Sequence, residues 1–295
     1  MLSTQPVESF PNLHKRVVNL LSEQVKTSAP TPQFALDLDR PNLLRDGVVT
    51  AGNDAMEFLD LVSAAMPDGD VYLFGGVLRD LALYGKKGFK SDIDLVVEGD
   101  WSDLVSYIEH LGARKNKFGG YRLLVGDWPV DIWNARDTWA IKHSHVKYTG
   151  ITSLLETTVL NWDAVLMNWR TGNFLARSDY LETLRKRMLH VVLEQNPNPL
   201  GMAVRVFRHL CMKDARQISA GAANYLARTT RTYSFEQLRQ SELQSYSRSS
   251  IEEAHYKAFK NFAEIEIKDD HKRWEAATEI VARQRGLWMH DLIAV

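Results

Sequence analysis

The chain has 295 residues, 45% of them hydrophobic, with a formal net charge of −1 and a single cysteine. This composition is ordinary for a folded protein of one large domain or two modest ones. A lone cysteine excludes an internal disulfide and a cysteine-based zinc site, and it fits a reducing cytosol. No apolar run approaches the roughly 20 residues of a membrane span, and the N-terminus lacks a secretory signal pattern, so we expect a cytoplasmic protein.

The first part of the chain predicts helices separated by an irregular arm. Charged and apolar residues alternate at helical spacing over 14–26, and 53–65 has a second helical pattern with Asn53 as a possible N-cap. The proline-containing stretch 27–47 between them is typical of a loop. We therefore expect residues 1–66 to form an N-terminal extension of helical and irregular structure.

The middle of the chain mixes β and α patterns. In chain order, the patterns predict a strand at 71–74, a helix at 77–84, a strand at 93–97, a helix at 101–111, strands at 121–125 and 130–133 joined by a turn at 126–129, and a hairpin with strands at 164–169 and from Phe174. These elements define an α+β domain over 67–178. Because only helical patterns follow from Tyr180, residues 179–295 are expected to form a helical C-terminal domain.

Two aspartates, Asp92 and Asp94, stand two positions apart at the start of the strand predicted at 93–97. The two-residue period of a strand places their side chains on one face, where two carboxylates repel each other unless a cation joins them. Mg²⁺ prefers carboxylate oxygens and keeps coordination sites open for water and substrate phosphates. A single Asp-x-Asp pattern is more often a pair of surface acids, so the prediction needs support from elsewhere in the chain.

Gly75 and Gly76 supply a second element, because they lie between a predicted strand and a predicted helix. Glycines at such a junction let the backbone approach a phosphate closely, and the N–H groups at the start of the helix face the same anion. A plain glycine turn is the alternative interpretation. The two patterns gain weight from their order along the chain.

The order strand, Gly-Gly, helix, loop, Asp-x-Asp, strand resembles that of the DNA polymerase β-like nucleotidyltransferase superfamily. GGVLRD (75–80), followed by SDIDL (91–95), resembles the head domain of the class II tRNA CCA-adding enzymes and bacterial poly(A) polymerases. The resemblance continues to Asp131 in the sequence VDIW and to Arg136. It covers about residues 70–210.

This resemblance implies a polymerase β-like head with a mixed sheet, followed by a helical, neck-like region. It implies transfer of a nucleoside monophosphate from ATP and/or CTP to an RNA 3′-hydroxyl, with tRNA the favoured acceptor and pyrophosphate released. Asp92 and Asp94 would bind Mg²⁺, or Mn²⁺ in its place, and Asp131 would be a third carboxylate that helps activate the hydroxyl. The residues assigned to the nucleotide are Gly75, Gly76, Arg79, Asp80, Arg136, Asp163, Arg205 and Arg208.

The sequence departs from this family where the family recognises the ribose and the base. Over 156–164 the family's Arg-Asp pair is absent, and Asp163 stands where asparagine is usual. Over 196–208 a helix start and two arginines three residues apart remain, and residues at that spacing share a helix face. The family's acidic residue is missing there, and Met202 occupies a position where arginine is common. The order CTP then ATP therefore does not transfer to this chain.

Two alternatives stay open. In the first, the same chemistry acts on a non-RNA acceptor such as a protein or a small molecule. In the second, the chain is a non-catalytic relative that binds nucleotide or RNA, and the intact aspartates argue against this second alternative. The basic segment 181–231 fits phosphate contacts or, more simply, a solvated helical face. His143 and His145 are expected to be exposed or packed rather than metal ligands, and Cys211 is expected to be a buried thiol.

Overall fold

The structure is a computed structural model that describes residues 5–22, 55–89, 91–116, 118–126, 128–264 and 269–291. The chain divides into two compact units. The first unit comprises the described residues of Met1–Leu155 together with Asp163–Arg177, and the second comprises those of Glu156–Trp162 and Ser178–Val295. The backbone therefore passes from one unit to the other three times, after Leu155, Trp162 and Arg177.

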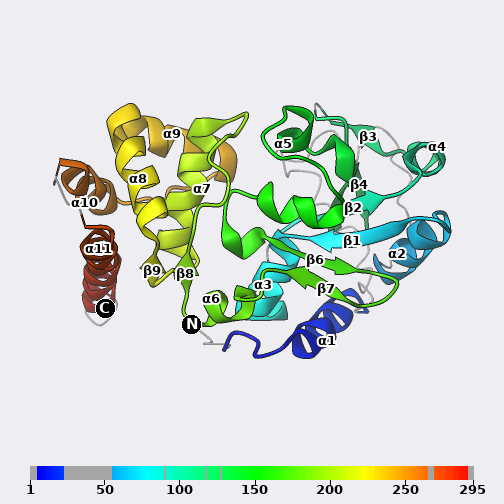
Figure 1. Ribbon diagram of the computed structural model, residues 1–295, viewed down its shortest axis with the longest axis horizontal. Helices are drawn as coiled ribbons and strands as arrows, with labels where there is room; N and C mark the ends of the chain where they lie inside the picture. The colour runs from blue at the N-terminus through cyan, green and yellow to red at the C-terminus, as the bar shows by residue number, and fades with distance from the viewer. Residues whose placement is uncertain are drawn as a thin grey trace, which may run out of the picture. The chain divides into compact units, whose positions relative to one another are not determined.

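The first unit is built on a mixed sheet with flanking helices (Figure 1). Its elements in chain order are α1 (Phe10–Leu21), α2 (Ala55–Ala64), β1 (Asp70–Phe74), α3 (Gly76–Tyr84), the 3-10 helix η2 (Lys86–Gly88), β2 (Ile93–Glu98), α4 (Trp101–His110), β3 (Arg114–Lys115), β4 (Tyr121–Val125), β5 (Trp128–Asn134), η3 (Ala135–Asp137), α5 (Trp139–Lys142), η4 (Ile151–Glu156), β6 (Val165–Asn168) and β7 (Phe174–Ala176). The short 3-10 helix η5 (Asn161–Asp163) carries the chain back into this unit.

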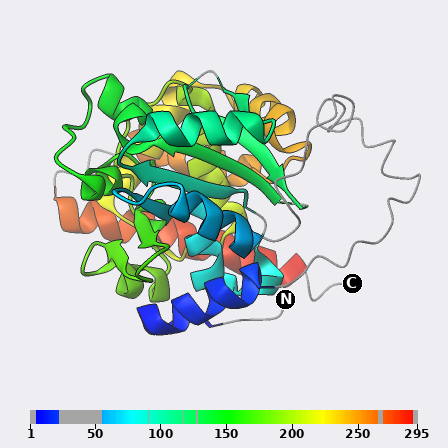
Figure 2. The same ribbon diagram turned by 90° about the vertical axis from the view of Figure 1, so that its right-hand side faces the viewer.

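The sheet has seven strands in the order β3-β4-β5-β2-β1-β6-β7. Strands β2 and β5 run parallel, and the other neighbouring pairs run antiparallel. Side chains alternate between the two faces along each strand. One face carries Tyr72, Val96 and Leu166, which form a buried cluster with Leu154 of η4. On the opposite face, the ring of Tyr121 lies 6.1 Å from that of Trp101 in α4, and Figure 2 shows α2 and α4 in front of the strands.

Helix α1, in the N-terminal extension, packs within the first unit. Its N-cap Ser9 accepts a hydrogen bond from the amide of Asn12, and the ring of Phe10 stacks on Phe174 of β7 at 4.9 Å. Arg16 donates to the carbonyl of Leu81 in α3 at 2.8 Å. The helix is therefore joined to both α3 and the edge of the sheet.

The second unit is mainly helical. Its elements are α6 (Tyr180–Arg185), β8 (Met188–Leu189), α7 (Pro199–Met212), β9 (Gln217–Ile218), α8 (Ala220–Thr232), α9 (Phe235–Tyr246), α10 (Glu253–Glu264) and α11 (Asp270–Asp291). Three phenylalanines form the centre of its core, Phe207 of α7 with Phe259 and Phe262 of α10. Among the described residues of both units, no helix combines the length and the apolar character needed to cross a bilayer.

The predicted α+β fold class is confirmed, and the differences lie in short segments. The C-terminal region contains a two-stranded parallel sheet, β8 with β9, that the helical prediction did not include. Strands of two residues carry no readable period, and β3 escaped prediction for the same reason. The predicted helix over 14–26 begins earlier, at Phe10, because Ser9 caps it. The predicted cap Asn53 lies outside the described residues.

The turn predicted at 126–129 is also shorter than expected. Trp128 pairs with Val125 and Pro129 pairs with Leu124, so both residues belong to β5. Proline is tolerated in a strand where its missing N–H is not needed. The parallel pairing of β5 with β2 begins only at Val130, so Pro129 has a neighbouring strand on one side only.

Candidate active site

Three aspartates meet on one face of the first unit's sheet. Asp94 of β2 and Asp131 of β5 are Cα partners in the parallel pair, and neighbouring strands lie about 4.8 Å apart. Asp94 is also the Cα partner of Phe74, which packs with the cluster around Tyr72 and Val96. Asp92 has the same parity as Asp94, so the predicted carboxylates share that face.

An arginine that the sequence analysis did not single out joins two of these carboxylates. Arg122 of β4 is the Cα partner of Asp131 across the antiparallel β4–β5 pair. Its Nε donates to Asp131 Oδ1 at 2.8 Å, and its Nη2 donates to Asp92 Oδ2 at 2.8 Å and to Asp131 Oδ2. The hydrogen bond with Asp131 raises the pKa of Arg122 above its usual value, against the effect of burial, and the charges of Asp131, Asp92 and Asp94 raise it further.

The Gly75-Gly76 turn joins β1 to α3. Gly75 has φ +63° and ψ −112°, a conformation that glycine adopts easily and other residues do not. Its amide donates to the carbonyl of Val165 in β6 at 3.0 Å. At Gly76, a side-chain Cβ would lie 3.1 Å from the Ser91 hydroxyl. Each glycine is therefore required for a different reason, the first by its φ angle and the second by a close neighbour.

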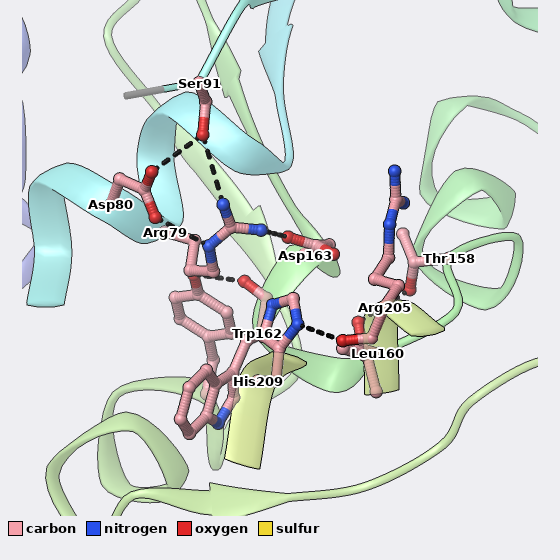
Figure 3. Close-up of polar contacts among 10 residues, drawn as sticks. Arg79, Asp80, Ser91, Thr158, Leu160, Trp162, Asp163, Arg205 and His209 are labelled. Atoms are coloured by element: carbon pink, nitrogen blue, oxygen red, sulfur yellow. Dashed lines mark hydrogen bonds and ion pairs between the residues drawn. The ribbon is translucent and has the colours of Figure 1, made fainter. Parts of the chain in front are cut away.

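Directly behind this turn lies a buried cluster of polar side chains (Figure 3). Arg79 of α3 donates from Nε to Asp80 Oδ1 at 2.8 Å, from Nη2 to Ser91 Oγ at 3.1 Å, and from Nη1 to Asp163 Oδ1. Ser91 in turn donates to Asp80 Oδ2 at 2.7 Å. Asp80 is completely buried, and Arg79 and Asp163 are nearly so. The cluster thus joins α3, the residue before Asp92 and the last residue of η5.

Charge compensation keeps this cluster ionised. Burial lowers the pKa of Arg79, but the charges of Asp163 and Asp80 outweigh burial and hold the pKa above its usual value. Asp163, which stands where asparagine is usual in the family, supplies one of the two negative charges that Arg79 faces. A buried carboxylate without a partner is costly, and Arg79 is the partner of Asp163. The structure therefore gives the departure at Asp163 a local explanation.

Arg136, the first predicted nucleotide residue after β5, lies in η3 and is exposed. Its guanidinium lies 4.7 Å from the centre of the Tyr148 ring. The hydroxyl of Tyr148 donates to Glu98 at the end of β2, and burial together with this bond raises the pKa of Tyr148. Arg136 is thus held by a cation–π contact within the first unit.

The two remaining candidates, Arg205 and Arg208, belong to α7 in the second unit. Arg205 is exposed. Arg208 is paired with the fully buried carboxylate of Glu242, and its guanidinium lies 3.9 Å from the centre of the Tyr246 ring. Met202, which stands where arginine is common in the family, is buried at 3% exposure. The roles of the two arginines toward a nucleotide stay a prediction.

The aspartate cluster has suitable chemistry for a divalent cation. Its members offer carboxylate oxygens, which Mg²⁺ prefers, and Arg122 already places one positive charge against two of them. Across the part of the chain that the structure describes, however, no group of three or more His, Cys, Asp and Glu side chains is arranged to hold a metal ion.

Sequence reasoning missed Arg122 and Ser91, although a signal for Arg122 was present. Arg122 lies one strand away from Asp131 in a predicted hairpin, and pairing that hairpin in register would have placed the two opposite each other. Ser91 precedes Asp92 in the quoted motif SDIDL. Nothing in the sequence indicated that its hydroxyl closes the Arg79 cluster from 11 residues away.

The weaker candidates have local partners. His143 and His145 are exposed, and their rings stack with Trp139 at 4.8 and 4.9 Å. Trp162 is completely buried in the second unit. Cys211 is partly buried, and burial raises its pKa to about 12. A thiol with such a pKa is a poor nucleophile at neutral pH.

A strand–Gly-Gly–helix turn and three aspartates on one face of a mixed sheet form the layout that the sequence resemblance predicts for a polymerase β-like head. No protein-family model matches the sequence, and no curated protein matches it significantly.

Several solved structures are similar to this chain. A CCA-adding enzyme in complex with ATP has a TM-score of 0.47 and 19% identity, over 70% of this chain and 51% of that one. A Thermotoga maritima CCA-adding enzyme complexed with tRNA has a TM-score of 0.49 and 17% identity, over 83% and 59% of the two chains. A tRNA nucleotidyltransferase with a primer tRNA and an incoming ATP analog has a TM-score of 0.48 and 16% identity, over 65% and 57%.

The chain spans 51% to 59% of the length of these three structures. Similarity at this level does not extend to activity or substrate. The functional inference therefore depends on the side chains of the site itself.

Proposed function

We propose that the protein is a metal-dependent nucleotidyltransferase that moves a nucleoside monophosphate from an NTP to an RNA 3′-hydroxyl and releases pyrophosphate. The observation that carries the proposal is the register of β2 and β5. It makes Asp94 and Asp131 neighbours on one sheet face, with Asp92 beside them. Three carboxylates on one face repel each other, and such a grouping is favourable where it binds cations.

Asp92 and Asp94 would hold Mg²⁺, or Mn²⁺ in its place. When bound, such an ion neutralises charge on the phosphates and lowers the pKa of a hydroxyl near it. Asp131 is positioned to orient the acceptor hydroxyl and to accept its proton. Because the chemistry asks mainly for positioning and charge compensation, few further groups are needed.

The Gly75-Gly76 turn is suited to the triphosphate. Helix geometry leaves the first amides of α3 without intrahelical acceptors, and such amides bind anions. The positive φ of Gly75 lets the backbone turn tightly into the helix. Arg79, Asp80 and Asp163 are bonded to each other, so we assign them the role of fixing the turn. Arg136, Arg205 and Arg208 stay as candidates for nucleotide contacts.

For the acceptor we favour RNA, and tRNA within that class. The resemblance of the motifs at 75–80 and 91–95 to those of tRNA CCA-adding enzymes supports this choice. ATP and CTP are accordingly the first nucleotides to test. Transfer to a protein or a small molecule would use the same three aspartates, so experiment has to distinguish these acceptors from RNA.

The test is nucleotide incorporation by the full chain. The protein is incubated with Mg²⁺, each α-labelled NTP in turn, and total RNA, purified tRNA without its 3′-terminal nucleotides, or no added acceptor. We expect label in tRNA. Asp94→Asn and Asp131→Asn should each reduce the rate by about 10²–10³-fold, the scale of removing charge stabilisation at a reacting centre.

Asp137→Asn is the matched control. Asp137 lies six residues after Asp131 and pairs with Lys142 at 3.1 Å, away from the aspartate cluster. Its removal should leave the rate unchanged. Label in the protein itself would move the assignment to a non-RNA acceptor. No label with any NTP and acceptor would overturn the proposal.

A further inference from the structure

Arg122 lies between two of the three aspartates of the candidate site. It donates to both Asp92 and Asp131 through three hydrogen bonds, two of them a parallel pair to Asp131. One of these oxygens belongs to Asp92, a proposed ligand of the divalent cation, and the others belong to Asp131 beside it. A guanidinium does not lose its proton in proteins, so a cation reaches those oxygens only if Arg122 moves aside.

The surroundings of Arg122 permit that movement. Its side chain is 48% exposed, and that of Asp92 is 44% exposed. The Arg122–Asp92 pair is therefore of the exposed kind that contributes only about 0–1 kcal/mol, whereas Asp131, the partner in the parallel pair of bonds, is 20% exposed. The cluster around Arg79 differs, because Arg79 and Asp80 have side-chain exposures of 9% and 0%. Of these two arginines, Arg122 therefore exchanges its hydrogen-bond partners more easily than Arg79 does.

Arg122 also has an alternative partner once nucleotide is bound. A guanidinium forms parallel hydrogen bonds to phosphate as readily as to carboxylate. If the metal of a bound triphosphate lies on Asp92 and Asp94, its phosphate oxygens offer such a partner to a released Arg122. Metal and nucleotide together therefore give back the bonds that Arg122 gives up, whereas a bare metal ion does not.

We propose that Arg122 is an internal competitor of the divalent cation. It neutralises Asp92 and Asp131 when no metal is bound, and it is displaced when metal and nucleotide bind together. This inference rests on the proposed function, since it takes Asp92 and Asp94 to be the metal ligands and Asp131 to lie beside them. It adds that metal binding without nucleotide is weakened by the chain itself, so that metal and nucleotide bind cooperatively.

The test is binding of Mn²⁺ alone to the full chain, followed by electron paramagnetic resonance or calorimetry. Arg122→Ala should tighten Mn²⁺ binding about three- to tenfold, because the competing cation is gone. Arg114→Ala is the matched control. Arg114 is the Cα partner of Arg122 on β3, so its replacement removes the same charge from the same part of the sheet. The Mn²⁺ affinity of this variant should change less than about twofold.

A second measurement uses no enzymatic turnover. Without metal, Arg122→Ala leaves the aspartates without their counter-ion, so its melting temperature should fall below that of the parent, and Mn²⁺ should raise it by more than it raises the parent's. Equal or weaker Mn²⁺ binding by Arg122→Ala, with binding still lost in Asp94→Asn, would overturn the inference and leave the proposed function intact. If neither the parent nor Arg122→Ala binds Mn²⁺, the metal site itself is wrong and both proposals fail.

Discussion

Arg79 is the residue on which the geometry of the glycine turn depends. Its guanidinium faces two carboxylates and a hydroxyl in a place that solvent hardly reaches. Buried ion pairs contribute little net stability relative to apolar residues of the same size, but breaking one is costly because the remaining charge is left without compensation. The cluster therefore acts chiefly to specify one arrangement of α3 and the segment before β6.

Replacing Arg79 with alanine should lower the free energy of unfolding by about 3–5 kcal/mol, because Asp80 and Asp163 lose their shared cation. Urea denaturation followed by circular dichroism measures this change. Arg177→Ala, at an exposed position of the same unit, should change stability by less than about 0.5 kcal/mol. Equal effects of the two substitutions would show that the cluster is not a structural centre.

His255 of α10 makes stability depend on pH. It is 5% exposed, its Nδ1 has no hydrogen-bond partner within the described residues, and burial lowers its pKa from 6.5 to about 4. A lowered pKa means that the unfolded chain binds the proton first. The contribution of His255 to stability is therefore complete above pH 6.5 and is lost as the pH falls toward 4.

We expect the parent to lose about 2 kcal/mol more stability than His255→Leu when the pH is lowered from 7 to 5. Urea unfolding of both proteins at the two pH values gives this difference directly, and other titrating groups cancel in it. A pH dependence that is identical in both proteins would contradict the shift in pKa.

At the scale of elements, the turn from β1 into α3 illustrates how glycines position a site. Gly75→Ala should cost about 1–3 kcal/mol, because alanine has to adopt a φ of +63°. The substitution should also weaken NTP binding, because the first amides of α3 move. Denaturation and nucleotide titration measure the two effects.

Gly221→Ala is the control for this prediction. Gly221 lies in the first turn of α8, where a Cβ would meet only the Ser219 hydroxyl at 3.8 Å. Alanine there should stabilise the protein by about 0.4–1 kcal/mol. If both glycine substitutions stabilised the protein, the positive φ of Gly75 would not be a constraint.

The sequence predicted the long elements well and the short ones poorly. Strands such as β4 alternate between buried and more exposed side chains and lie where expected, because this alternation reflects two different faces of the sheet. The two-residue strands β8 and β9 lack such a signal. For the site, spacing predicted which residues share a face, as with Asp92 and Asp94. It could not predict partners from other strands, and Arg122 was missed because its role depends on register rather than on its neighbours in sequence.

At the scale of the whole molecule, the division into units does not follow the order of the chain. Residues 156–162 belong to the second unit although sheet residues of the first unit lie on both sides of them. Trp162 anchors this segment. Its Nε1 donates to the carbonyl of Met188 at 2.7 Å, its own carbonyl accepts from the hydroxyl of Tyr180, and its ring lies 6.0 Å from that of His209.

Trp162→Ala should therefore destabilise the second unit by about 3–5 kcal/mol, the usual cost of removing a large buried aromatic ring. Hydrogen exchange resolved by peptide is the measurement, because it reports the two units separately. Exchange should accelerate in 178–264, and strands β1 and β2 should stay protected. Trp169→Ala, a partly exposed tryptophan of the first unit, should leave 178–264 unchanged. Faster exchange confined to β1 and β2 would contradict the assignment of Trp162.

The three crossings between units also order events during synthesis on the ribosome, where N-terminal parts of a chain emerge and fold first. The sheet is complete once β7 has emerged at Ala176, because this edge strand pairs with β6, which pairs with β1. At that moment the partners of Trp162 at Tyr180, Met188 and His209 are still inside the ribosome. The nascent chain thus passes through a stage with a finished sheet and an uncovered tryptophan segment, which is the kind of surface that chaperones bind.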